Sequence, residues 1–482
     1  MLDRRRGVCA AVIATGSLIL AGQANAAQQP TIKLKFGIEK AQLEQLRAQQ
    51  QSTQAAPAQP GKRARGEAAG SGTLSLLRGA ALSRDNAAPA GPTAMAAPIG
   101  EQPDGTARER CFGGSGVESQ RGRIHNRFVY CQRVQVVAEY WEIDNTGVPV
   151  ELEGTTTANL EVFTQGDDHA RRVRTFARIQ KDSVDYDWGP IDNIFVAPNV
   201  PLSMIGQCAQ SFDVCHATRG PATMAWTTWD NNEDWYYWDV YNHEDAAEGR
   251  DKIGYNQWYV ELFTDSSEYQ TLVRGKTNPR MLRCDSATYF NRGNASYPEA
   301  CVFSEVTPHL DYQLGSDHHS VAFHIFNAQS HPNATYPLLT PPGVPAPRDK
   351  RIPGEYVAGD PDAPGLHRIT QTLHPGEYKA NSDHKDGACY KRGPHRDEYL
   401  DTGLPTPPNT PDEQCDEYPF ASTLEGAGNP YWDFSVMAVP QRDNSVAGAL
   451  LSNYYVDDRI LAWDADLDRP DETNDRFYVH IE

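Results

Sequence analysis

Acidic residues gather on a short stretch near the carboxyl end of the chain, between Cys415 and Gly426. Asp416, Glu417 and Glu425 all fall within it, beside an aromatic–proline step that predicts a turn. Carboxylates on a turn can take a proton from water or bind a cation. This stretch is therefore the first candidate for a reaction centre.

A second polar group stands further along the chain, at the start of a predicted helix. Asp443 and Asn444 precede the run Val446–Tyr455, and an Asp or Asn before good helix formers is typical of an N-cap. A predicted apolar strand over residues 436–439 separates this group from the acidic stretch. Carboxylate and amide oxygens brought together are the ligands of a hard cation, so the pattern predicts an Mg²⁺ or Mn²⁺ site.

Basic residues precede the acidic stretch. Lys391, Arg392 and Arg396 form a cluster in which base outweighs acid, and Arg442 follows later. Positive charge beside the acidic stretch is available to bind an anionic substrate. We therefore expect these four cations to bind substrate, although Arg442 could equally be an exposed loop charge.

Three motifs carry a resemblance to a known family. They are Asp-Glu-Tyr-Pro-Phe-Ala at residues 416–421, Glu-Gly at 425–426 and Val-Pro-x-x-Asp-Asn-x-x-x-Gly at 439–448. In type, order and spacing they resemble the NucA/NucB-type secreted bacterial deoxyribonucleases, and the resemblance does not reach residues 1–335. It implies a small α+β domain that hydrolyses DNA phosphodiester bonds without sequence specificity.

The resemblance also implies a role for each polar residue. Asp416 is the implied general base that activates water, with Glu417 as the second choice. Glu425 and Asn444 are the implied metal ligands, and Asp443 is a further candidate. Any one of these residues alone could be a helix cap, a solvated turn or an ion-pair partner, but their joint occurrence at the family's spacing favours a site.

One departure from the family concerns phosphate binding. Several family members carry Asp-Arg ahead of the Asp-Glu pair, where this chain has Gln414 and Cys415. An arginine that could hold phosphate is therefore missing. The cluster from Lys391 to Arg396 is the expected replacement.

The overall charge limits the class of protein. With 44 basic and 64 acidic residues the formal net charge is −20, whereas dedicated nucleic-acid scaffolds are usually basic. A nuclease can function with this charge if bound metal and a local basic patch supply the positive field. Its affinity for DNA is then expected to be modest and sensitive to salt.

The amino-terminal region predicts export. Residues 1–26 have the three parts of a signal peptide: the charged Arg4–Arg6, the apolar Val8–Leu20 and the cleavage motif Ala24–Ala26. No later segment approaches the ~18 apolar residues that span a membrane. We expect a secreted, extracellular or periplasmic protein that is monomeric and not bound to a membrane.

Cysteine usage agrees with export. Removal of Cys9 with the signal peptide leaves an even number of cysteines, which in an exported chain indicates disulfides. No C-x₂-C spacing supports the rival interpretation, a zinc site. The expected bridges join sequence neighbours: Cys111 with Cys131, Cys208 with Cys215, Cys284 with Cys301, and Cys389 with Cys415.

Composition divides the mature chain into three parts. Residues 27–110 contain a short helical pattern (Ile38, Leu43, Leu46) and then an Ala-, Pro- and Gly-rich segment, so we expect a disordered linker or propeptide. The cluster Lys62–Arg65 in this segment is either a processing site or solvated linker charge.

Residues 111–335 predict a β-rich accessory domain, because short alternating segments are separated by turn residues. The expected strands include residues 134–140, 160–162, 235–241, 258–263 and 321–326. A proline-rich hinge over residues 332–349 leads into the nuclease-like domain, residues 336–482. The expected fold class is α+β overall: an all-β, sandwich-like middle domain followed by a small α+β domain.

Two further clusters allow a functional interpretation. The aromatic run Trp235–Trp238 could stack sugars or bases, but alternation on a strand would bury two of its four side chains. His318, His319 and His324 could bind a metal, but neighbouring residues on a strand point to opposite faces. We expect core packing for the first cluster and no shared ion for the second.

Two functions therefore remain open. One is a secreted, metal-dependent DNA endonuclease with an accessory β domain. The other is a secreted β-rich surface- or glycan-binding protein whose nuclease-like domain does not turn over. The acidic charge and the aromatic-rich middle domain favour the second, and the set Asp416, Glu425 and Asn444 favours the first.

Overall fold

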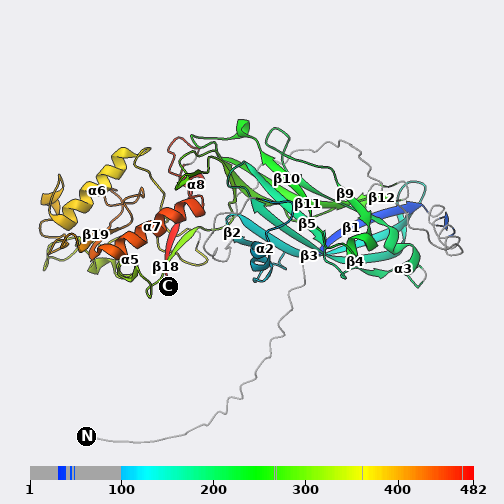
Figure 1. The fold of residues 1–482 in the computed structure, drawn as a ribbon, viewed down its shortest axis with the longest axis horizontal. Helices are drawn as coiled ribbons and strands as arrows, with labels where there is room; N and C mark the ends of the chain where they lie inside the picture. The colour runs from blue at the N-terminus through cyan, green and yellow to red at the C-terminus, as the bar shows by residue number, and fades with distance from the viewer. Residues whose placement is uncertain are drawn as a thin grey trace, which may run out of the picture.

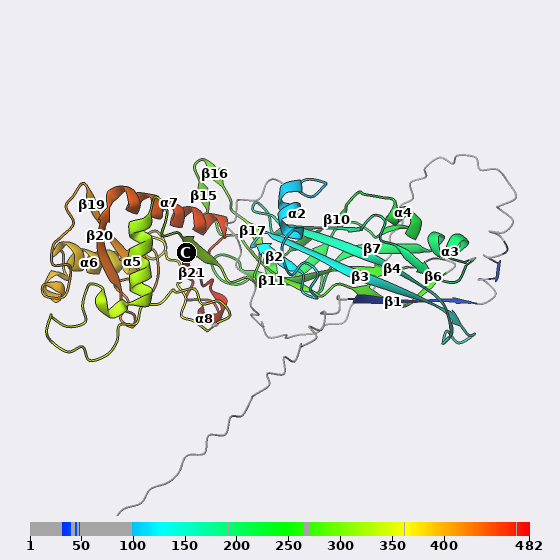
Figure 2. The same cartoon turned by 90° about the horizontal axis from the view of Figure 1, so that it is seen from below.

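The computed structural model describes residues 31–39, 44, 45, 48 and 99–482, except 191, 265, 267, 268, 361 and 469. The predicted signal peptide, the cluster Lys62–Arg65 and most of the predicted linker lie outside the described residues. A β-rich unit and a smaller α+β unit follow each other along the longest axis (Figures 1 and 2). Among the helices of the described part, none has both the length and the apolar character needed to cross a membrane.

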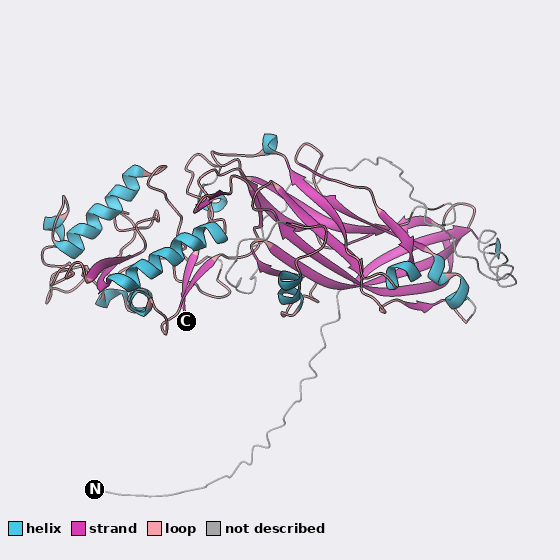
Figure 3. Ribbon diagram, viewed as in Figure 1, coloured by secondary structure: helices cyan, strands magenta, loops and turns pink. Residues whose placement is uncertain are grey.

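The β-rich unit consists of two sheets, and Figure 3 shows how strands dominate it. The larger sheet contains β1 (Thr31–Glu39), β2 (Arg123–Asn126), β3 (Val129–Ile143), β4 (Pro149–Gly166), β5 (Arg172–Ile179), β6 (Asp185–Asp187), β8 (Cys215–Ala217), β10 (Tyr236–Asn242) and β12 (Gln270–Val273). The smaller sheet contains β7 (Pro201–Cys208), β9 (Ala222–Ala225), β11 (Gly254–Phe263), β13 (Gly275–Lys276), β14 (Arg280–Asp285) and β17 (Ala300–Phe303). Shorter elements of this unit are α2 (Gly105–Phe112), α3 (Asp192–Phe195), α4 (Trp226–Asp230), η1 (Ala197–Asn199), η2 (Glu244–Ala246) and the hairpin β15 (Asn291–Arg292) with β16 (Ala295–Ser296).

The two sheets share one hydrophobic core. Val136 and Leu160 from the larger sheet and Leu202 and Val260 from the smaller sheet belong to it, and none of the four is exposed. Along β3, buried and half-buried residues alternate from Val134 onward, as a strand with one face in a core requires. The predicted α+β fold class with a sandwich-like middle domain is confirmed.

The linker prediction is wrong for the parts of residues 27–110 that pack on this unit. Ile32, Leu34 and Phe36 are buried at every second position of β1, which pairs with β3 in parallel and with β12. Apolar residues at every second position indicate a strand. The prediction relied instead on the wider spacing of Ile38, Leu43 and Leu46, which suggested a short helix. Residues 99–110 also pack on this unit, since Ile99 and Ala107 lie against one of its core clusters. Helix α2 begins in this segment at Gly105, after the capping side chain of Asp104.

The aromatic run divides between core and surface. Trp235 and Trp238 are buried, whereas Tyr237 is half-buried between the guanidinium groups of Arg174 and Arg219, 4.0 and 3.7 Å from its ring centre. Two of the four side chains are buried, as expected, but not by alternation, because Trp235 precedes strand β10.

The C-terminal unit surrounds a second core with helices and short strand pairs. Its elements are β18 (His309–Tyr312), α5 (His319–Ser330), η3 (Pro332–Ala334), α6 (Pro375–Tyr390), η4 (Arg396–Tyr399), β19 (Glu413–Tyr418), β20 (Ser435–Pro440), α7 (Gln441–Asp457), α8 (Pro470–Thr473) and β21 (Tyr478–Ile481). β19 and β20 pair in antiparallel orientation, and β18 and β21 pair in parallel. The core between them includes Tyr418, Val439 and Phe477.

The strand predicted over residues 321–326 is wrong, because this segment belongs to helix α5. Val321, Ala322, Ile325 and Ala328 are buried, a spacing that follows the helical period. The run of apolar residues is compatible with either structure when it is read locally. α5 packs against α7 and β20, so residues before the proline-rich segment contribute to the C-terminal core. The domain limits given above remain a prediction.

Buried ion pairs join the two units. Arg459 follows α7 and bonds Asp285 of β14, with Nη2 and Oδ1 2.6 Å apart, and neither side chain exceeds 2 % exposure. Arg283 contacts both Asp285 and Asp475. Burial alone would raise the pKa of Asp475, but the guanidinium groups of Arg127 and Arg283 hold it well below its usual range.

Replacement of Asp285 by Ala should destabilise the chain by about 3–5 kcal/mol, because it leaves the buried guanidinium group of Arg459 without its carboxylate partner. The free energy of unfolding in urea is the measurement. Asp457→Ala is the matched control, since its partner Arg292 is partly exposed and such pairs contribute at most about 1 kcal/mol. Equal losses in the two variants would contradict the assigned importance of the buried pair.

All four predicted disulfides are confirmed. Bonds join Cys111 to Cys131, Cys208 to Cys215, Cys284 to Cys301, and Cys389 to Cys415. The last of these ties the end of α6 to β19, so it links two elements that form the cleft described next.

Candidate active site

A cleft of about 660 Å³ lies along strand β19 in the C-terminal unit, between residues of α6 and α7. Its wall includes Asp416 and Glu417 from β19, Lys385 from α6 and Asn444 from α7. The register of the β19–β20 hairpin, with Asp416 opposite Met437, fixes the two carboxylates on the strand. The cleft therefore gathers acids, a base and an amide from three elements.

Asp416 is held from behind by a buried histidine. His324 of α5 is 2 % exposed; its Nδ1 lies 2.6 Å from Asp416 Oδ2 and its Nε2 lies 2.7 Å from Ser435 Oγ. If Nδ1 carries the proton, it donates to the carboxylate while Nε2 accepts from the serine hydroxyl. His324 does not line the cleft, so it orients Asp416 and does not touch a substrate.

Glu417 sits beside Asp416 with unusual acid–base properties. The side chain is half-buried in the cleft wall. Burial, together with the neighbouring charge of Asp416, raises the pKa of Glu417 to about 7, against the opposing effect of Lys385. A carboxyl group with this pKa is present in both protonation states near neutral pH, which suits a group that transfers protons.

The cations of the cleft are not the predicted ones. Lys385 and Arg368 line it. Lys385 Nζ lies 3.8 Å from a carboxylate oxygen of Asp386. Arg368 donates to the carbonyl of Ile460 at 2.8 Å and lies against the ring of Tyr455. The Arg368 guanidinium also lies 5.3 and 5.0 Å from the ring centres of Tyr289 and Phe290, so packing fixes its position. Lys385 acts on the pKa of Glu417 and is therefore the cation near that carboxyl group.

The four cations predicted to bind phosphate do not line the cleft. Lys391 ends α6 and donates to the carbonyls of Tyr399 and Leu400. The other three form ion pairs: Arg392 with Asp386, Arg396 with Asp397, and the exposed Arg442 with Asp317. A local excess of base in the sequence thus reflects helix capping and surface pairs.

Asn444 lies in the cleft, but Asp443 does not. Asn444 Nδ2 donates to Gln414 Oε1 at 3.0 Å, which leaves its carbonyl oxygen available as a ligand. Asp443 is buried and its Oδ2 accepts from the backbone N–H of Ser320 at 3.2 Å, so it caps α5. The predicted N-cap role at its own helix is wrong, because α7 already begins at Gln441.

Glu425 lies apart from the cleft wall in a buried pair. Its two oxygens accept from the backbone N–H and from Nδ1 of His367, at 2.8 and 2.7 Å. The imidazole packs edge-on against Trp463, and its Nε2 is buried without a hydrogen-bond partner. The structure therefore brings together Asp416, Glu417 and Asn444, and does not bring Glu425 or Asp443 to them.

Sequence reasoning missed three residues of the site. His324 was set aside because its segment was interpreted as a strand, whereas a helical interpretation aims it at the hairpin. Lys385 stands among alternating acids and bases, and Arg368 is an isolated arginine, so neither gives a local signal.

Two carboxylates, two cations and an amide that line one cleft make a site suited to phosphoester hydrolysis. Residues 367–464 match the family model described as Deoxyribonuclease NucA/NucB. The resemblance is thus confirmed for the C-terminal domain, and it indicates a nuclease domain with DNA as its substrate. The chain matches no curated protein and no solved structure.

Proposed function

We propose that this protein is an exported, metal-dependent endonuclease that hydrolyses DNA phosphodiester bonds without sequence specificity in the cleft along β19. The observation that carries the proposal is that Asp416, Glu417 and Lys385 all line one cleft, within the segment that matches the nuclease family.

The two carboxyl groups divide the proton transfers. Asp416, oriented by His324, takes a proton from the attacking water, whose oxygen then forms a bond to phosphorus. The P–O bond to the leaving sugar oxygen breaks, and protonated Glu417 gives that oxygen its proton. Adjacent carboxyl groups in different environments are a common basis for such a division of roles.

The fixed cations offset the charge of the phosphate. Developing charge on the non-bridging oxygens is stabilised when donors are already in place, because no reorganisation is needed during the reaction. Lys385 suits this role, since it lines the cleft and its charge acts on Glu417, and Arg368 adds a second positive charge at the wall. No base edge is read by such contacts, which agrees with nonspecific cleavage.

A hard divalent cation fits the oxygen donors of this wall. The carbonyl oxygen of Asn444 is the group that would hold Mg²⁺ or Mn²⁺, with water completing most of the shell, because these ions accept few protein ligands. When bound, such an ion supplies charge relief at the phosphate.

Export is part of the proposal. Four disulfides are typical of proteins that fold in an oxidising compartment. The predicted signal peptide over residues 1–26 supports the same conclusion.

Supercoiled plasmid incubated with the purified mature chain tests the proposal. We expect nicked, then linear, then fragmented DNA in Mg²⁺ or Mn²⁺, no cleavage in excess EDTA, and recovery when the metal is restored. The rate should fall as salt is added, because the cations of the cleft contact phosphate electrostatically. Intact plasmid under every metal condition would favour the rival, a non-catalytic binding protein.

A further inference from the structure

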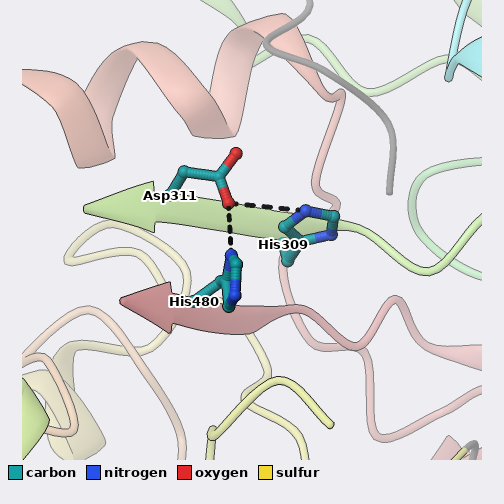
Figure 4. Close-up of side chains that lie close together, drawn as sticks. All are labelled: His309, Asp311 and His480. Carbon is teal, nitrogen blue, oxygen red and sulfur yellow. Dashed lines mark hydrogen bonds and ion pairs between the residues drawn. The ribbon is translucent and has the colours of Figure 1, made fainter. Parts of the chain in front are cut away.

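The parallel strands β18 and β21 carry two histidines and an aspartate on one face. Asp311 pairs in register with His480, and His309 lies two residues before Asp311, so all three side chains share a face. Leu310 and Val479 point the other way, into the C-terminal core. The three side chains therefore converge outside the core (Figure 4).

The geometry directs nitrogen and oxygen atoms to one point. His309 Nε2 and His480 Nδ1 lie 3.5 and 3.1 Å from Asp311 Oδ1. One potential ligand atom from each residue lies within 4.8 Å of the other two. Figure 4 shows both rings facing the carboxylate. A small movement of each side chain would open space for an ion between them.

The surroundings already orient the first ring. His309 Nδ1 lies 3.3 Å from the carbonyl oxygen of Thr307, and the ring stacks on Tyr356 with centres 4.3 Å apart. A hydrogen bond from Nδ1 to a backbone carbonyl leaves Nε2 as the ligand atom, which is the support that metal-bound histidines commonly have. The side chain of His309 is 1 % exposed, so its position is fixed by packing.

We propose that His309, Asp311 and His480 bind Zn²⁺. Two imidazoles and one carboxylate suit a borderline-soft ion, whereas Mg²⁺ and Ca²⁺ prefer oxygen ligands alone. The Glu482 carboxylate lies 3.5 Å from His480 Nδ1 and is the nearest candidate for a fourth ligand, with water as the alternative. This site lies outside residues 367–464, and it is independent of the metal proposed for the cleft.

The ion would fasten the two ends of the C-terminal unit. β18 precedes the nuclease-family segment and β21 follows it, and the two strands pair over four residue pairs. Tyr312, next to Asp311, lines the cleft and donates to the carbonyl of Ala447 in α7 at 2.8 Å. Zinc at this position would therefore stabilise the frame of the cleft without reaching its chemistry.

Metal-stripped full-length protein, titrated with Zn²⁺ against a chromogenic chelator, tests the site. We expect one tight Zn²⁺ site in the wild type. His480→Ala and Asp311→Asn each remove a ligand, so they should lower the Zn²⁺ affinity by more than the roughly 10–100-fold that loss of a supporting hydrogen bond costs. Zn²⁺ should raise the unfolding temperature of the wild type and not that of the variants. Co²⁺ should give the visible absorption of a tetrahedral site only where both histidines are present.

His395→Ala is the matched control, since His384, His395 and Glu398 form another His/His/carboxylate group in the described chain. The control should keep the tight site and the Zn²⁺-dependent stabilisation. Circular dichroism checks that each variant is folded. Zinc affinity unchanged in both His480→Ala and Asp311→Asn, or lost in the control, would overturn the proposal and leave only a His–Asp ion pair here. Plasmid cleavage, measured separately, reports on the cleft.

Discussion

DNA cleavage by Asp416→Asn should be about 10²–10⁴-fold slower than by the wild type, because the amide has the size of the carboxylate but cannot take a proton from water. His324 Nδ1 can still lie against an amide oxygen, so the fold of the hairpin should persist. Initial rates of plasmid nicking in Mg²⁺ measure the effect, and far-ultraviolet circular dichroism checks the fold.

Two further variants show whether the loss is specific. Asp397→Asn makes the same chemical change at an exposed side chain outside the cleft and should retain the wild-type rate. His324→Gln should lower kcat more than it raises KM, because it disturbs the orientation of Asp416 and leaves the phosphate-binding cations in place. Wild-type cleavage by Asp416→Asn would assign the base to Glu417 or remove the cleft from the reaction.

Local sequence patterns predicted the strands and disulfides that depend on residues close together in the sequence. Alternation over residues 134–140 predicted β3, since one face of a sandwich strand must be apolar. The cysteine pairs could be predicted because each joins near neighbours, such as Cys208 and Cys215, seven residues apart. In both cases the information is contained within a short window of sequence.

The partners of the polar side chains could not be predicted from a short window of sequence. His324 and Asp416 are 92 residues apart, and His367 and Glu425 are 58 apart, so nothing local indicates that they meet. The spacing of the family motif singled out Asp416, Glu417, Glu425 and Asp443 as candidates. It could not show that Glu425 faces a histidine while Asp416 faces the cleft, because that depends on how the loops fold over the hairpin.

The strand prediction for residues 321–326, which belong to α5, failed for a different reason. Val321, Ala322 and Ile325 are compatible with a buried strand or a buried helix over so short a length. Packing against α7 and β20 decides in favour of the helix. The error mattered for function, because it removed His324 from consideration as a partner of Asp416.

Replacement of Glu417 by Gln should remove the alkaline decline of cleavage. The pKa of Glu417 is raised to about 7, so its acidic form is present below neutral pH and is lost as the pH rises through 7. Wild-type cleavage should therefore decline above pH 7 with an apparent pKa near this value. The Gln variant cannot give up a proton, so at pH 6 it should cleave about 10²–10⁴-fold more slowly and show no decline with this pKa.

The same substitution should stabilise the protein at high pH. Between the ordinary pKa of 4.5 and about 7, folded Glu417 holds a proton that the unfolded chain releases, so stability falls as the pH rises through this window. Gln carries no charge at any pH and avoids this loss. The variant should thus unfold at a higher temperature than the wild type at pH 8, with a smaller difference near pH 4.5.

The exposed Glu109 provides the control, since Glu109→Gln should change neither the pH profile of cleavage nor the pH dependence of unfolding. Slower cleavage together with greater stability at pH 8 is the signature of a carboxyl group buried for function at a cost in stability. A Glu417→Gln protein that retains the alkaline decline of the wild type would remove Glu417 from the proton transfer. Its remaining role would then be that of a half-buried wall residue beside Asp416.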